Sequence, residues 1–152
     1  MINNIHDFIS ISVLFFNYDY LIKCLHGDFS YYFMLVFLLY FEHQLKIYFK
    51  TWNIQIFMRP DNAYNCGLLN DGGYVGDQCG FPSGHSLTTS FYFYVYYFQN
   101  QKNMGSYKKL WLSMIQIPIL LVMNSRLNKH CHNEIQVFGG YVLGLFFAFL
   151  FY

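Results

Sequence analysis

The chain has 152 residues, about the length of one domain, and 55% of them are hydrophobic. Aromatic residues make up 23% and charged residues only 11%, whereas a soluble domain carries about 25% charged residues. So few charges exclude a soluble enzyme, a disordered chain and a coiled coil, and a formal net charge of +1 gives no basic excess for nucleic acid. The composition predicts a small polytopic membrane protein.

Five apolar stretches, separated by polar breaks, predict an all-α membrane bundle of about five transmembrane helices. In chain order they span about residues 8–25, 29–49, 86–98, 110–123 and 135–152. A helix needs about 20 residues to cross a bilayer, so the third and fourth stretches must be extended by flanking residues. The stretches are continuous rather than alternating, which favours helices, although the aromatic richness leaves buried strands as an alternative. We expect residues 1–152 to form a single membrane-embedded domain.

The placement of lysine predicts the orientation of these helices. The break at 99–109 contains three lysines and no acidic residue, so the positive-inside rule makes it cytoplasmic. The long break at 50–84 and the short break at 125–134 then both lie on the non-cytoplasmic side. We therefore expect an integral multi-pass membrane protein whose polar breaks at 50–84 and 125–134 share the luminal or extracellular side.

Two polar segments in these breaks contain the residue types that bind phosphate. The first contains Arg59-Pro60 and then Phe81-Pro82-Ser83-Gly84-His85, and the second runs from Ser125-Arg126 to His132. Arginine guanidinium groups match phosphate oxygens bidentately, and backbone N–H groups at a helix start, here Ser83 to His85, can face an anion. Two histidines allow one to act as a nucleophile and the other as a general acid.

These motifs carry a resemblance over about residues 50–144. The order Arg-Pro, Pro-Ser-Gly-His and Ser-Arg-x5-His resembles the type 2 phosphatidic acid phosphatase family of membrane lipid phosphatases, whose superfamily includes dolichyl diphosphatases. The resemblance implies hydrolysis of a lipid phosphomonoester or a polyprenyl diphosphate at the exoplasmic membrane interface, without a metal or other cofactor. The loop at 59–66 that leads to 80–85 is also similar to members encoded by large DNA viruses.

The resemblance implies a role for each motif residue. His132 would attack phosphorus and form a phosphohistidine, and His85 would protonate the leaving oxygen. Ser83 Oγ would donate a hydrogen bond to the phosphoryl group. The phosphoryl oxygens would be held by Arg59, Arg126 and the backbone of Ser83 and Gly84.

Two positions depart from the family pattern. The lysine that the family places seven residues before Arg59 is replaced by Trp52, and the nearest lysine is Lys50. Two residues are about 200° around a helix, so Lys50 would be a phosphate ligand only on an irregular backbone. The aspartate expected four residues after His132 is Gln136, which can accept the ring N–H and fix the tautomer. These departures support an alternative to the hydrolase, a catalytically weak or inactive membrane scaffold or lipid-binding protein with the same fold.

Other polar residues have simpler interpretations. Glu42 lies within an apolar stretch, so it must face the bundle or water, and we expect it to pair with Lys46 rather than to take part in catalysis. A Cys66–Cys79 disulfide just before the motif turn is a hypothesis for a non-cytoplasmic loop. The cysteine and histidine spacing does not match a zinc site, so we expect no metal.

Overall fold

The structure, a computed structural model, describes residues 5–6, 9, 29–67 and 71–152. Within these ranges the chain is all-α and contains no β-strand, which confirms the predicted fold class. The helices are α3 (Ser30–Trp52), α4 (Gly84–Asn100), α5 (Lys108–Asn128) and α6 (Glu134–Leu150), with the short 3-10 turns η1 (Gln55–Phe57) and η2 (Gly105–Tyr107). The first predicted stretch, residues 8–25, lies almost entirely outside the described residues.

Each of the last four apolar stretches forms one helix, and polar motif residues extend two of these helices. α4 begins at Gly84, inside the Pro-Ser-Gly-His motif, and α5 continues through Arg126 to Asn128. In the described part of the chain, one helical segment, residues 105–128, is by itself long and apolar enough to cross a bilayer, and α6 is a shorter apolar helix. Length and hydropathy therefore mark α5 most clearly as a membrane span.

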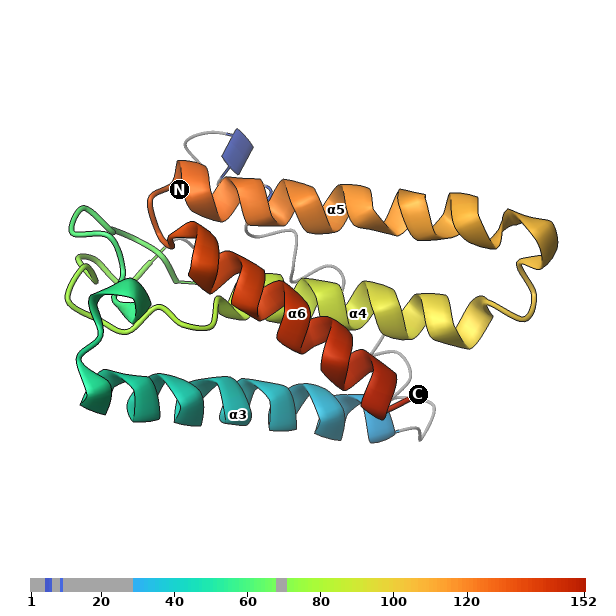
Figure 1. Ribbon diagram of the computed structural model, residues 1–152, viewed down its shortest axis with the longest axis horizontal. Coiled ribbons are helices and arrows are strands. Elements are labelled where there is room, and N and C mark those ends of the chain that lie inside the picture. The colour runs from blue at the N-terminus through green and yellow to red at the C-terminus, as the bar shows by residue number, and fades with distance from the viewer. Residues whose placement is uncertain (1–4, 7–8, 10–28, 68–70) are drawn as a thin grey trace.

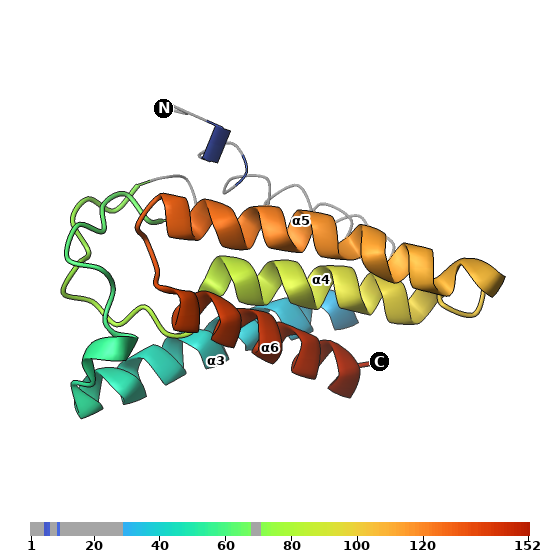
Figure 2. The ribbon, with the colours of Figure 1, turned by 45° about the horizontal axis from the view of Figure 1, so that its top comes forward.

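The helices form a bundle whose connections lie at its two ends. α3, α4 and α5 extend along the same direction, and α6 crosses α4 obliquely (Figure 1). Figures 1 and 2 show the loop between α3 and α4 at the same end of the bundle as the turn between α5 and α6. The connection between α4 and α5 lies at the opposite end. The two motif-bearing breaks thus lie at one end of the bundle, as expected from the order of the apolar stretches.

The most extensive contact between helices is that of α4 with α6, and it depends on small residues. Gly140, Gly144 and Ala148 recur every four residues on one face of α6. A Cβ at Gly140 would overlap the carbonyl oxygen of Ser83, and a Cβ at Gly144 would overlap that of Leu87. Glycine at these positions lets the two backbones approach closely, as in the small-xxx-small contacts of membrane helices.

Apolar side chains fill the interior of the bundle and also cover much of its outside. The largest buried cluster joins all four helices and includes Leu38, Leu87, Phe91, Ile119 and Phe147. Large apolar side chains are also exposed on the outer faces of α3, α5 and α6, among them Phe33, Tyr40, Ile117, Leu120, Phe138 and Phe149. A soluble monomer rarely exposes so many large apolar side chains, and these outer faces suit contact with lipid.

Candidate active site

Motif residues from distant parts of the sequence line one cavity of about 310 Å³. Its walls come from one face of α3, the first turns of α4, and the two loops at the same end of the bundle. Arg59 enters from the long loop, Gly84 and His85 from the start of α4, and His132 from the turn before α6. The cavity therefore combines one guanidinium group, two imidazole rings and a helix N-terminus, a set that suits a phosphoryl group.

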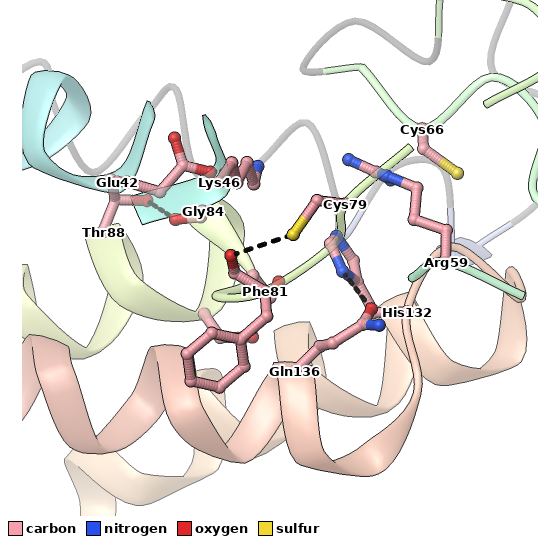
Figure 3. A network of polar contacts seen from close by, with 12 residues as sticks. Glu42, Lys46, Arg59, Cys66, Cys79, Phe81, Gly84, Thr88, His132 and Gln136 are labelled. Carbon is pink, nitrogen blue, oxygen red and sulfur yellow. Dashed lines mark hydrogen bonds and ion pairs between the residues drawn. The ribbon is translucent and has the colours of Figure 1, made fainter. Parts of the chain in front are cut away.

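Gln136 fixes the tautomer of His132. The Gln136 side-chain nitrogen Nε2 donates to the carbonyl oxygens of Met58 at 2.7 Å and Ile56 at 3.3 Å. The amide oxygen Oε1 must then be the atom that lies 3.0 Å from His132 Nδ1, so Nδ1 carries the proton. This leaves Nε2 of His132 as the nitrogen with a free lone pair (Figure 3).

His132 is 3% exposed, and its surroundings favour the neutral ring. Burial lowers the pKa of His132 well below its ordinary value, because the charged ring is poorly solvated, and the positive charges of Arg59 and Arg126 lower this pKa further. A neutral imidazole is the nucleophilic form of histidine.

His85 is also buried, in the first turn of α4. Its ring nitrogen Nε2 has no hydrogen-bond partner among the residues that the structure describes. An unpartnered buried nitrogen is costly unless a ligand or water satisfies it. Since His85 lines the same cavity as His132, its position suits a proton donor to a group bound there.

The two arginines donate hydrogen bonds to backbone carbonyl groups of the two loops near the site. Arg59 Nη1 donates to the carbonyl oxygen of Cys131 at 3.2 Å, and burial lowers the pKa of Arg59 while the Glu42 carboxylate opposes that shift. Arg126, at the end of α5, is fully buried, and its Nη2 donates to the carbonyl oxygen of Cys66 at 2.7 Å. Arg126 does not line the cavity itself, but its charge lowers the pKa of His132 there.

The disulfide links Cys66 to Cys131, so the predicted pairing of Cys66 with Cys79 is wrong. The turn between α5 and α6 brings Cys131 beside the long loop, where the Cα atoms of Cys66 and Cys131 are 5.5 Å apart. Cys79 is a buried free thiol that donates to the carbonyl oxygen of Phe81. The bridge ties the loop after Arg59 to the residue before His132, and each half-cystine accepts a hydrogen bond from one of the arginines.

The start of α4 differs in part from the expected anion cradle. Ser83 is the N-cap residue and is buried, but its N–H donates to the carbonyl oxygen of Gln136 at 2.9 Å and so is not available to a ligand. Its hydroxyl oxygen lies 3.3 Å from that of Ser86. Gly84 lines the cavity, and the first N–H groups of a helix lack acceptors within the helix. The cradle therefore begins at Gly84 rather than at Ser83.

Lys50 lies outside this cavity, and a different lysine lines it. Lys50 is exposed in the last turn of α3 and lines a neighbouring cavity of about 300 Å³ with Asp77. Lys46, one helical turn earlier, lines the cavity of His132 together with Glu42, and the expected Glu42–Lys46 ion pair is confirmed. The motif spacing could not reveal that Lys46 lines the cavity, because the face of α3 that meets the site depends on how α3 packs.

In the part of the chain that the structure describes, no group of three or more histidine, cysteine or acidic side chains is arranged to hold a metal ion. Three charged side chains line the cavity. They are those of Lys46, Arg59 and Glu42. Any stabilisation of a bound phosphoryl group by these residues is therefore electrostatic and hydrogen-bonding in character.

Comparison with known proteins agrees with the motif-based resemblance. Residues 27–152 match the family model of the PAP2 superfamily. The fold is similar to that of a transmembrane PAP2-type phosphatidylglycerolphosphate phosphatase from Bacillus subtilis, known from a crystal structure, with a TM-score of 0.59 and 22% sequence identity. The alignment covers 96% of this chain and 74% of that chain. No curated protein matches this chain.

Proposed function

Because this chain belongs to the PAP2 superfamily, we propose that it is a metal-independent membrane phosphatase acting through a phosphohistidine on His132. Its substrate would be a lipid phosphomonoester or a polyprenyl diphosphate. The observation that carries the proposal is the hydrogen bond from His132 Nδ1 to Gln136, which leaves Nε2 as the nucleophile in a cavity shared with His85 and Arg59. Without this bond, His132 would have no partner that fixes which of its two nitrogens carries the proton.

Two displacements at phosphorus account for hydrolysis. In the first, His132 Nε2 forms a bond to phosphorus while the bond from phosphorus to the leaving oxygen breaks, and His85 gives that oxygen a proton. In the second, water attacks the phosphohistidine, His85 takes a proton from the water, and inorganic phosphate leaves with His132 regenerated. Because one Arg59 nitrogen is held by the Cys131 carbonyl, its remaining N–H groups can stabilise the phosphoryl oxygens as charge develops.

The shape of the cavity favours a lipid substrate. Leu35 and Leu39 line it on α3, on the same helical face as Glu42 and Lys46. The polar groups are thus continuous with an apolar wall along the length of α3. A phosphoryl group bound between Arg59 and the histidines would leave its hydrocarbon chain beside these leucines.

The position of the site in the bundle favours the non-cytoplasmic side of a membrane. The two loops that carry Arg59 and His132 lie at the end opposite to the lysine-rich connection between α4 and α5 (Figure 1). The positive-inside rule assigns that connection to the cytoplasm. The Cys66–Cys131 disulfide, at the site end, suits an oxidising compartment.

Phosphate release by the purified full-length chain in detergent tests this function. We expect release from phosphatidic acid or a polyprenyl diphosphate in the presence of a metal chelator. His132→Ala should remove all measurable activity, whereas His43→Ala, a matched change of an exposed histidine on α3, should leave it unchanged. Equal background release by the wild type and His132→Ala would contradict an enzyme and favour the scaffold or lipid-binding alternative.

A further inference from the structure

Glu42 and Lys46 form an ion pair in the wall of the cavity, where a phosphoryl group is expected to bind. Their side chains are 12% and 22% exposed, so the pair is largely shielded from water. Figure 3 shows both residues on α3 beside Gly84, with the Lys46 side chain and the Arg59 guanidinium group extending toward the same space near His132. An isolated surface pair would have no reason to face the catalytic groups.

The Glu42 carboxylate lies at the start of α4, a position that attracts anions. A Cβ added at Gly84 would be 3.0 Å from Glu42 Oε1, so a side chain there would require the carboxylate to shift by a few tenths of an ångström. Helix N-termini bind carboxylates and phosphates by the same N–H groups and the same dipole. The charge of Glu42 also reaches Arg59, where it opposes the lowering of the Arg59 pKa by burial.

We propose that Glu42 is an internal anion that competes with the substrate phosphoryl group, and that Lys46 transfers from Glu42 to this group when substrate binds. The proposal rests on the proposed function and adds a cationic ligand and a competing carboxylate to it. Lys46 thereby provides the charge that the family pattern would place at Trp52. Glu42 would keep weakly bound anions out of a site rich in positive charge.

Electrostatic attraction favours the movement of Lys46 from Glu42 to the bound phosphoryl group. A phosphoryl dianion attracts the Lys46 ammonium group more strongly than a single carboxylate does, and charge-assisted hydrogen bonds to it are short and strong. The same dianion repels Glu42, which lies against the same helix terminus. Since Lys46 also lowers the pKa of His132, its charge already reaches the nucleophile. A lysine that moves onto the phosphoryl group would stabilise the charge that builds there.

Binding of orthovanadate to the full-length protein in detergent, measured by calorimetry, tests the proposal. We expect Glu42→Gln to tighten vanadate binding about tenfold, because the competing charge is removed and Lys46 is released. Lys46→Met should weaken binding about tenfold, and Lys46→Arg should retain most of the wild-type affinity. Asp61→Asn and Lys102→Met, matched changes at exposed positions away from the cavity, should bind as the wild type does. Thermal melting without vanadate identifies any variant that fails to fold.

The outcomes separate this proposal from a structural ion pair and from the proposed function. If Glu42 only holds Lys46 in place, Glu42→Gln will weaken vanadate binding in the same way as Lys46→Met, and the proposal is wrong. Wild-type affinity in folded Glu42→Gln and Lys46→Met also overturns it, while phosphate release by the wild type would leave the proposed function intact. Absence of both vanadate binding and phosphate release in the wild type would overturn the two together.

Discussion

At the scale of single residues, Gln136 is the side chain that links His132 to the neighbouring loop backbone by hydrogen bonds. Its side chain accepts from His132 and donates to the carbonyl oxygens of Ile56 and Met58. It also forms a capping box with Asn133 at the start of α6, and its own carbonyl oxygen accepts from the Ser83 N–H. A carboxylate could accept from the imidazole but could not donate to the two carbonyl groups. The departure from the family's aspartate therefore fits the local backbone.

We expect Gln136→Glu to be less active and less stable than the wild type, although it restores the negative charge of the family pattern. The carboxylate would face two carbonyl oxygens in a buried position, so we expect kcat to fall at least about tenfold and the free energy of unfolding to fall by about 2 kcal/mol. Phosphate release and thermal melting measure the two effects. Gln78→Glu, an exposed change of the same kind, is the control. Higher activity in Gln136→Glu would show that the carboxylate is the better partner for His132.

At the scale of helices, the crossing of α4 and α6 positions both histidines. Gly140 and Gly144 bring the α6 backbone against the first turns of α4, which carry His85, and α6 begins just after His132. A side chain at Gly144 would separate the helices. The site geometry therefore depends on a contact that contains no catalytic residue.

Gly144→Val should destabilise this contact by about 2 kcal/mol, because an added side chain overpacks a close interface. We expect a lower melting temperature and reduced phosphate release together. Val142→Ala, on an exposed part of α6, changes side-chain volume without touching the interface and should have little effect. An unchanged melting temperature in Gly144→Val would mean that α4 and α6 can move apart without loss of stability.

The Cys66–Cys131 disulfide joins the loops that carry Arg59 and His132, and its removal should make both loops more mobile. We expect the double variant Cys66→Ser/Cys131→Ser to lose about 2–4 kcal/mol of stability and a large part of its activity. A reductant should reproduce the effect in the wild type, and Cys79→Ser should not, because Cys79 is a free thiol. Activity that is indifferent to reductant would show that the hydrogen bonds of the arginines hold the loops without the bridge.

At the scale of the whole molecule, apolar runs predicted the four described helices, and the two motif breaks lie at one end of the bundle as expected. Long apolar segments leave the chain few alternatives to helices, and this is why that prediction was accurate. The disulfide partner and the cavity lysine could not be predicted in this way. Cys131 and Lys46 reach the site through the packing of α5, α6 and α3, which short-range spacing does not encode.

The orientation of the bundle in a membrane remains a prediction, and labelling with a membrane-impermeant maleimide tests it. Single cysteines would be introduced as Asp71→Cys at the site end and Lys102→Cys at the opposite end, in a background where Cys24 and Cys79 are serine. We expect labelling of Asp71→Cys in intact cells, and of Lys102→Cys only after the membrane is permeabilised. The reverse pattern would place the site on the cytoplasmic side.

The most direct measurement is the trapping of phosphate on the protein during turnover. The full-length chain would be mixed with a lipid substrate labelled in the phosphoryl group, quenched rapidly in alkali and digested. We predict acid-labile, alkali-stable label on the peptide that contains His132, and no label in His132→Ala. Turnover of the labelled substrate with the label absent from this peptide, or present on another residue, would contradict a phosphohistidine at His132.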